Sequence, residues 1–282
     1  MNEEQFTPDS LIEKRERRVA EARKFNLLSN VFMSVALNDK GACQHVLRIL
    51  TGITDLVVIE IRSQYRISKV VSRDAILDIL AEDGSGRLYN LEIQRSDTVD
   101  HARRTRFYGA MIDSEYLEKG CSYDKLPEVY IIYVSERDLW KSGYTLYRVQ
   151  SIYKGTDIPY EDGRHILYVN AEVDDHTEIA GLMNYFKESD PNDMSQGELS
   201  RRIHYLKCEE GGYEEMCEIS EKIYREGMEE GMEKGMEKGM EKGKIYGAVE
   251  TYRELGLSRE EILDKLCQRF SLLPKNAEKY LQ

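Results

Sequence analysis

Two carboxylates and an amide, on residues an even number of positions apart, stand within one short segment of the chain. Asp78, Glu92 and Gln94 belong to residues 73–96, which read RDAILDILAEDGSGRLYNLEIQRS. Two runs of apolar residues flank a Gly-Ser-Gly sequence here, a pattern typical of a β-hairpin. If the turn is centred on Ser85, Asp78 and Glu92 face each other, because each lies seven residues from the centre. Gln94 follows Glu92 by two residues and therefore shares its face of the strand.

The opposed carboxylates at positions 78 and 92 could support metal chemistry. Side chains directly opposite each other have Cβ atoms about 5 Å apart. Two negative charges at that distance repel by about 3 kcal/mol at an effective dielectric near 20. Exposure, protonation of one acid or a bound cation would relieve this repulsion. Mg²⁺ prefers oxygen ligands, lowers the pKa of a bound water and neutralises charge on phosphate oxygens. From the hairpin alone, two acids on a solvated face of the sheet are an equal alternative.

The surrounding residues predict a mixed α/β sheet that would position this hairpin. Apolar residues at helical spacing predict a helical pair over 26–51, interrupted near Asn38–Gly41 and ending at Gly52. The strands are predicted at 56–61, 75–81, 88–94, 127–135, 145–149 and 165–170, with 127–135 in the centre. A long helix is predicted from Val99 to Lys119. The order α-β-β-β-α-β is typical of a sheet with helices on its faces.

Further helices are predicted on both sides of this core. Residues 10–24 are predicted to form a charged helix, and helices are also expected at 176–187 and 195–208. Ser195 and Glu198 have the spacing of a capping box, as have Ser258 and Glu261 near the C-terminus. Pro274 is expected to stop the last of these helices.

Residues 211–244 have an unusual repeat. Glycines recur every four residues from Gly227 to Gly243, and Met and Glu follow each of the first four. Glycine costs a helix roughly 1 kcal/mol per residue, and neighbouring Glu–Lys pairs return only part of this cost. One interpretation is a solvated, partly frayed helical linker. The other is a stripe of small residues and methionines along which two chains pack, which would make the protein a homodimer through its C-terminal helical region.

Composition limits the class of protein. The net charge is −12, but residues 209–244 contribute 12 acids and 6 bases, so half of the negative charge lies in the repeat. Basic clusters occur elsewhere, and phosphate attraction depends on such local patches. The five cysteines are scattered, which indicates reduced thiols and no zinc site. No long apolar run and no signal-like N-terminus are present, so we expect a cytoplasmic protein without a membrane span.

Several stretches in a fixed order resemble the PD-(D/E)xK nuclease family transposases, which are related to the recombination-promoting nuclease (Rpn) group. They include LDILAEDGSGRLYNLEIQR, RRTRFYGAMIDSEYLEKGCSYDKLPEVYIIYVSERD, EDGRHILYVN, RIHYLKCEEGGYEEMC and EGMEEGMEKG. This resemblance covers roughly residues 25 to 245. It implies a restriction-endonuclease-like mixed sheet core (αβββαβ) and a Mg²⁺-dependent endonuclease that hydrolyses DNA, associated with recombination or a mobile element.

The resemblance also assigns roles to individual residues. Asp78 and Glu92 match the metal-binding acids, and the backbone carbonyl of Ile93 is a further expected ligand. Gln94 stands where the family usually has a lysine, and glutamine has no charge and cannot act as a base. In the following helix, Arg104 and Arg106, together with Arg103, are the expected phosphate contacts.

The expected organisation is a charged N-terminal helix (1–24), a PD-(D/E)xK nuclease-like core (25–210), the glycine repeat as a helical linker (211–244) and a small helical C-terminal module (245–282).

Two departures from the family pattern keep a second function open. Besides Gln94, Ser29 and Asn30 stand where relatives often have acids ahead of Phe-Met, so a third acidic ligand is missing there. Asp83 is a nearby acid, but Asp-Gly turn chemistry explains it better. The alternative function is a catalytically degenerate relative that binds nucleic acid, or assembles through its tail, without cutting.

Overall fold

The computed structural model describes residues 24–68, 74–94, 100–270, 272 and 274–281. The chain divides into two compact units, Met1–Glu221 and Lys222–Gln282. The helix predicted over 10–24 lies outside the described residues except for Lys24.

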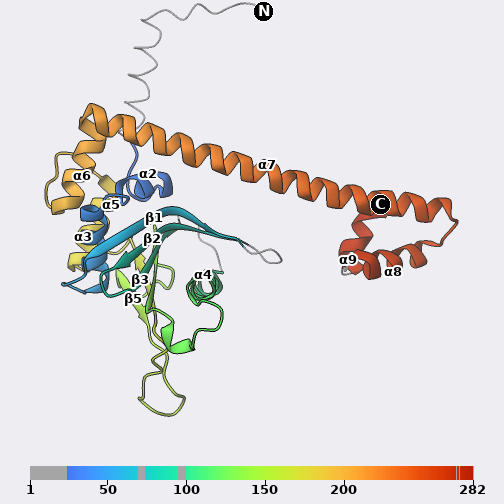
Figure 1. The fold of residues 1–282 in the computed structure, drawn as a ribbon, viewed down its shortest axis with the longest axis horizontal. Helices are drawn as coiled ribbons and strands as arrows, with labels where there is room; N and C mark the ends of the chain where they lie inside the picture. The colour runs from blue at the N-terminus through green and yellow to red at the C-terminus, as the bar shows by residue number, and fades with distance from the viewer. Residues whose placement is uncertain (1–23, 69–73, 95–99, 271, 273, 282) are drawn as a thin grey trace, which may run out of the picture. The chain divides into compact units, whose positions relative to one another are not determined.

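A six-stranded mixed sheet forms the centre of the first unit (Figure 1), with the order β1-β2-β3-β4-β6-β5. Its strands are β1 (Val58–Ile67), β2 (Ala75–Asp83), β3 (Leu88–Gln94), β4 (Val129–Ser135), β5 (Leu146–Val149) and β6 (Arg164–Asn170). β1, β2 and β3 are antiparallel neighbours, β3, β4 and β6 are parallel, and β5 pairs antiparallel with β6 at the edge. The mixed α/β fold and the interior position of β4 are confirmed. β1 is longer than predicted because its pairing with β2 continues to Ile67.

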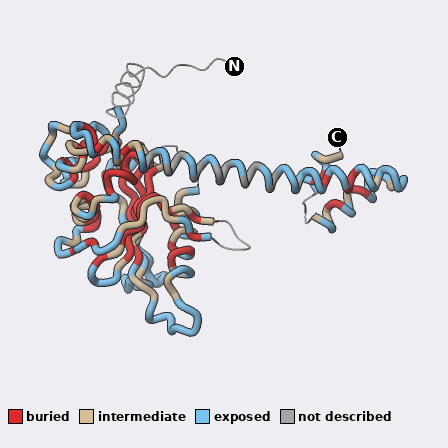
Figure 2. The backbone as a smooth tube through the Cα atoms, turned by 45° about the horizontal axis from the view of Figure 1, so that its top comes forward, coloured by how far each residue is buried: buried red, intermediate tan, exposed pale blue. Residues whose placement is uncertain are grey.

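Helices cover both faces of this sheet. On one face, α2 (Asn30–Ala36), α3 (Lys40–Thr51), α5 (Glu178–Glu188) and α6 (Gly197–Cys208) share a large apolar core with alternate strand residues such as Leu91 and Val134. On the other face, α4 (His101–Tyr116) buries Met111 and Ile112 against Leu88 and Ile131. A short 3₁₀ helix, η1 (Tyr123–Lys125), precedes β4. Figure 2 shows that the buried residues of this unit are concentrated in the strands and in the helices packed against them.

Local signals explain the ends of α3. Its N-cap, Asp39, accepts a hydrogen bond from the backbone N of Ala42, and its C-cap, Gly52, has a left-handed φ of 79°. These are the two chemistries that favour a helix start at Asp and a helix end at Gly. The predicted helical pair before β1 is therefore confirmed.

The predicted capping box of α6 is wrong. The N-cap is Gln196, which makes no side-chain capping bond, and its backbone N donates to Ser200 Oγ at 3.0 Å. Gly197 has a φ of +52°, so the chain turns once more after Ser195 before the helix begins. Glu198 consequently lies within the first turn and pairs with Arg201.

The second unit is helical. α7 (Glu210–Glu254) begins in the first unit and carries the glycine repeat in helical conformation. α8 (Arg259–Phe270) starts with the predicted capping box, since Glu261 N donates to Ser258 Oγ and Ser258 N donates to Glu261 Oε2.

The expectation that Pro274 stops this helix is wrong. α8 ends at Phe270, and Pro274 is the first residue of α9 (Pro274–Ala277), a position where its missing N–H costs nothing. The 3₁₀ helix η2 (Glu278–Tyr280) follows. Among the described residues, no helix is long and apolar enough to cross a membrane.

Candidate functional site

The hairpin register predicted from the turn is confirmed. β2 and β3 pair through Ile79↔Leu91, Leu80↔Asn90, Ala81↔Tyr89 and Glu82↔Leu88. Asp78 and Glu92 lie one step beyond the Ile79↔Leu91 pair, away from the turn. Here carboxylate side chains accept hydrogen bonds from the backbone of the facing strand: Asp78 N donates to Glu92 Oε1 at 3.1 Å, and Ile93 N donates to Asp78 Oδ2 at 3.0 Å. Each carboxylate therefore lies against the backbone beside the other.

Both acids are buried. Asp78 is 9% exposed and Glu92 is 6% exposed, so the alternative of two acids on a solvated sheet face does not describe this hairpin. Burial raises the pKa of Glu92 well above its ordinary value, and the charge of Asp78 raises it further. Burial also raises the pKa of Asp78, against the hydrogen bonds from Ile93 and Gln64. A bound cation would remove this electrostatic cost of ionising both groups.

The neighbours of Asp78 come from β1 and α2, and the sequence did not indicate them. Gln64 has a φ of 48° inside β1, and its amide nitrogen donates to Asp78 Oδ1 at 3.1 Å and to Ser34 Oγ at 3.0 Å. Ser34 Oγ lies 3.4 Å from the Asp78 backbone oxygen, to which it donates. Positive φ is rare for a non-glycine strand residue. No local pattern in residues 64–68 (QYRIS) predicts the positive φ of Gln64, because this conformation depends on contacts with a distant strand and helix.

Glu92 has neighbours on its own strand and on α4. In the orientation of its amide that satisfies both neighbours, Asn90 donates from its side-chain nitrogen to Glu92 Oε1 at 3.0 Å and to the backbone oxygen of Ile79 at 3.2 Å. The hydroxyl of Tyr108 on α4 interacts with Glu92, and burial, followed by the charge of Glu92, raises the pKa of this tyrosine. A signal for Tyr108 was present: it follows Arg104 by four residues and so shares its helix face.

α4 brings one of the three predicted arginines to the site. Arg104 Nη1 donates to Gln94 Oε1, and the charge of Arg104 lowers the pKa values of both Asp78 and Glu92 against the effect of burial. Arg103 and Arg106 are exposed on the helix surface. Successive helix residues point about 100° apart, so only one of these side chains can face Gln94.

The oxygen donors at the hairpin fit a hard divalent cation. Over the part of the chain that the structure describes, no three His, Cys, Asp or Glu side chains gather into a possible metal site. Mg²⁺ commonly uses only one or two protein carboxylates and keeps several waters. The two carboxylates are therefore enough protein ligands for such an ion, and the Ile93 carbonyl stays a predicted further ligand. From α2, a hydroxyl (Ser34) and no carboxylate approaches Asp78, in keeping with the absence of acids at Ser29 and Asn30.

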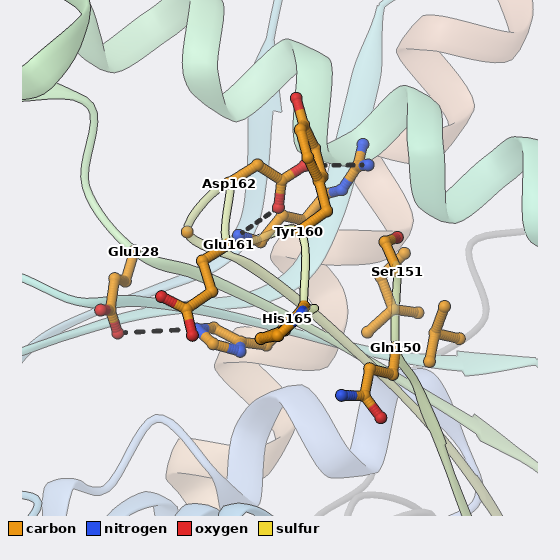
Figure 3. Close-up of a pocket in the computed structure, with 12 residues that line it drawn as sticks. Glu128, Gln150, Ser151, Tyr160, Glu161, Asp162 and His165 are labelled. Carbon is orange, nitrogen blue, oxygen red and sulfur yellow. Dashed lines mark hydrogen bonds and ion pairs between the residues drawn. The ribbon is translucent and has the colours of Figure 1, made fainter. Parts of the chain in front are cut away.

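A pocket of about 450 Å³ lies elsewhere in the fold (Figure 3). It is lined by residues before β4 and at the start of β6, including Glu128, Glu161 and Asp162. His165 Nε2 lies 3.6 Å from Glu128, and Arg164 pairs with Asp162. In the strand register, Arg164 of this pocket is aligned with Leu88 of β3. Leu88 precedes Glu92 by four residues, so the pocket lies roughly 13 Å along the strands from the paired carboxylates. The pocket has three acids against one arginine and one histidine, which disfavours phosphate, so we assign the candidate site to the paired carboxylates.

Comparison with known families identifies the family of the sheet core. The family model described as PD-(D/E)XK nuclease family transposase matches residues 46–191, which is 146 of the 282 residues. The matched segment contains all six strands and α4, and hence Asp78, Glu92, Gln94 and Arg104. No curated protein and no solved structure matches the chain.

Proposed function

Because the chain belongs to the PD-(D/E)XK nuclease family transposases, we propose that it is a Mg²⁺-dependent endonuclease that hydrolyses phosphodiester bonds of DNA. We propose further that it acts in recombination or on a mobile element, as the family description suggests. The observation that carries the proposal is the pair of buried carboxylates, each hydrogen bonded to backbone beside the other. Such a pair is costly to ionise without a cation, and a cation bound there can bind phosphate.

In this proposal the site residues have separate tasks. Asp78, Glu92 and the Ile93 carbonyl hold Mg²⁺, which when bound would neutralise charge on the scissile phosphate and acidify a water. Gln64 orients Asp78 through its hydrogen bond to Oδ1, and Asn90 orients Glu92. Arg103 and Arg106, exposed on α4, contact phosphates along the DNA and set its position.

Arg104 supplies the positive charge that a lysine at position 94 would give. Its guanidinium contacts Gln94, and its charge acts on both acids. We expect Arg104→Gln to lower the cleavage rate about tenfold or more, because the negative charge that develops in the transition state would no longer be stabilised by a fixed cation. The double variant Gln94→Lys/Arg104→Gln should recover most of that rate, since it returns the charge to the strand.

Single-turnover cleavage by the three proteins (wild type, single and double variant) measures this effect. Equal rates for the single and double variants would contradict the electrostatic role of Arg104. Arg201→Gln on α6 serves as the control for loss of an arginine away from the site, and wild-type cleavage is expected from it.

The deciding experiment is a cleavage assay with supercoiled plasmid and single-stranded DNA, with Mg²⁺ and with EDTA. We expect cutting with Mg²⁺, none with EDTA, and loss of cutting when Asp78 or Glu92 is replaced. Cutting that survives either replacement would exclude this site as its source.

A second candidate function is nucleic-acid binding without cleavage. Gln94 in place of lysine, and Ser29 and Asn30 in place of acids, favour it. Intact DNA binding combined with no cutting of any nucleic acid, at any Mg²⁺ or Mn²⁺ concentration, would favour this candidate over the nuclease.

We also propose that the protein is a homodimer through its C-terminal helical region. Four methionines of the repeat, spaced four residues apart on α7, are between 57% and 71% exposed: Met228, Met232, Met236 and Met240. A period of four drifts by about 40° per step around a helix, so these side chains wind slowly along one flank. Sedimentation should give a dimer for the full chain and a monomer for a protein ending before Gly227. A dimer in both would place the interface elsewhere.

A further inference from the structure

Trp140 is the single tryptophan of the chain and is 42% exposed. Three rings contact the indole: Tyr168 at 4.8 Å and 69°, Tyr147 at 4.9 Å and 55°, and His101 at 5.3 Å and 84° between planes. All three approach at steep angles, so none of them stacks flat against a face of the indole. Isolated exposed apolar side chains are common and need no explanation. The case for Trp140 therefore depends on how it is held and on where it lies.

The loop that carries Trp140 is built around a buried carboxylate. Asp138 is 6% exposed; its Oδ1 accepts from Trp140 N at 3.1 Å and from the Tyr147 hydroxyl at 2.7 Å. Its Oδ2 accepts from Gly143 N at 2.9 Å, and its own N donates to Glu172 at 2.7 Å. These bonds tie the β4–β5 connection into one arrangement. An aromatic side chain held in advance loses little conformational freedom when it binds a partner.

Two of the residues that contact this indole link it to the proposed catalytic site. Tyr168 is level with Tyr133 and with Glu92 across the parallel strands, which puts Tyr168 two strands, or roughly 10 Å, from Glu92. His101 and Arg104 are three residues apart and share a face of α4. His101 contacts Trp140, and Arg104 contacts Gln94. One turn of α4 therefore separates the residue that contacts Trp140 from the residue that contacts Gln94, two positions after Glu92.

We propose that Trp140 stacks against an unpaired nucleobase of the strand being cut. This inference rests on the proposed nuclease function and names its substrate class: nucleic acid that is single-stranded, frayed or bubbled next to the scissile phosphate. In a duplex, neighbouring bases cover both faces of each base, whereas an unpaired base presents a face to an aromatic side chain. Stacking of this kind tolerates any base and requires no specific hydrogen bonds. The roughly 10 Å between Glu92 and Tyr168, which the indole contacts, corresponds to about three nucleotides at a stacked spacing of 3.4 Å.

Intrinsic fluorescence tests the contact without requiring cleavage. All tryptophan emission of the full chain comes from Trp140. In EDTA, titration with a single-stranded oligonucleotide should quench this emission in parallel with binding measured by anisotropy of a labelled strand. A blunt duplex of the same sequence should bind with little quenching. Binding of single strands without quenching, or equal quenching by the duplex, would overturn the proposal and leave the indole available to a protein partner.

Variants test the consequence for affinity and cleavage. Trp140→Leu should weaken single-strand binding about tenfold or more, and Trp140→Phe should weaken it less, because the phenyl ring retains a π face. Tyr153→Leu is the matched control: this side chain is 54% exposed and lies in the β5–β6 connection, at the other end of the strands from Glu92. It should bind single strands as the wild type does. Melting temperatures of all three variants exclude loss of fold, and the wild-type quenching needs no variant.

Cleavage mapping separates failure of this inference from failure of the nuclease proposal. With a duplex that contains a short bubble, the wild type in Mg²⁺ should cut within about three nucleotides of the unpaired bases. Cutting at positions unrelated to the bubble, or unchanged cutting by Trp140→Leu, would reject the stacking role while the nuclease stands. Quenching by single strands with no cutting in any metal would reject the nuclease and support the stacking contact.

Discussion

Replacing Glu92 with Gln should reduce DNA cleavage at least about 100-fold and leave the fold intact. Loss of one metal-binding carboxylate removes several kcal/mol of transition-state stabilisation, and each 1.36 kcal/mol is a factor of ten. The substitution should not destabilise the protein. The amide oxygen of the new side chain can still accept from Asp78 N, and the raised pKa of Glu92 indicates that its charge is a cost in the metal-free protein. Single-turnover cleavage and a thermal melt measure the two effects.

Asp78→Asn should abolish cleavage to a similar extent but with a cost in stability. Both carboxylate oxygens of Asp78 accept hydrogen bonds, from Gln64 and from Ile93 N. An asparagine offers only one acceptor, so one of these bonds is lost, at about 1 kcal/mol. Glu82→Gln, on the same strand but outside the site, is the matched control and should cut as the wild type does. A variant of Asp78 or Glu92 that retains near wild-type cleavage would remove the site from the mechanism.

Stability and metal binding should depend on pH through Glu92. The pKa of Glu92 in the folded protein is well above the ordinary 4.5. Between these two values the folded state binds more protons than the unfolded state, so the contribution of Glu92 to stability falls as pH rises through that range. Relative to the wild type, Glu92→Gln should melt at a similar temperature near pH 4.5 and at a higher temperature at pH 8. The gain should be about 3–5 °C for each unit by which the pKa is raised.

Mg²⁺ should act in the same direction as that substitution. At about 100 times its dissociation constant, a ligand of the folded state stabilises by roughly 2.7 kcal/mol, or about 5–10 °C for a domain of this size. We expect this shift at pH 8, its loss toward pH 4.5 as the carboxylates are protonated, and its absence in Glu92→Gln. A Mg²⁺ shift that persists in the variant would place the ion elsewhere.

Several features that depend on residues close together in the chain could be predicted from the sequence, although the local signals at Ser195 and Pro274 were misinterpreted. The turn of the hairpin is one example: Asp83 Oδ1 accepts from Ser85 N and Arg87 N, as expected for Asp-Gly turn chemistry. That turn sets the register, so the facing of Asp78 and Glu92 followed from it. The capping residues of α3 and α8, and the order of helices and strands, are likewise encoded by local patterns. Local energetics suffice there because every interacting group lies within four residues.

Features that depend on distant contacts were decided only by the tertiary structure. Burial of Asp78 and Glu92, which turns two facing acids into a pair that is costly to ionise, requires α4 and the neighbouring strands. Gln64 reaches Asp78 from 14 residues away and Ser34 reaches it from 44. The choice of Arg104 over Arg103 and Arg106 depends on the rotation of α4 about its axis, and the place of Trp140 depends on the pairing of β4 with β6. The periodicity of apolar residues predicts which face of a helix or strand is apolar. Only tertiary packing determines which residues that face contacts.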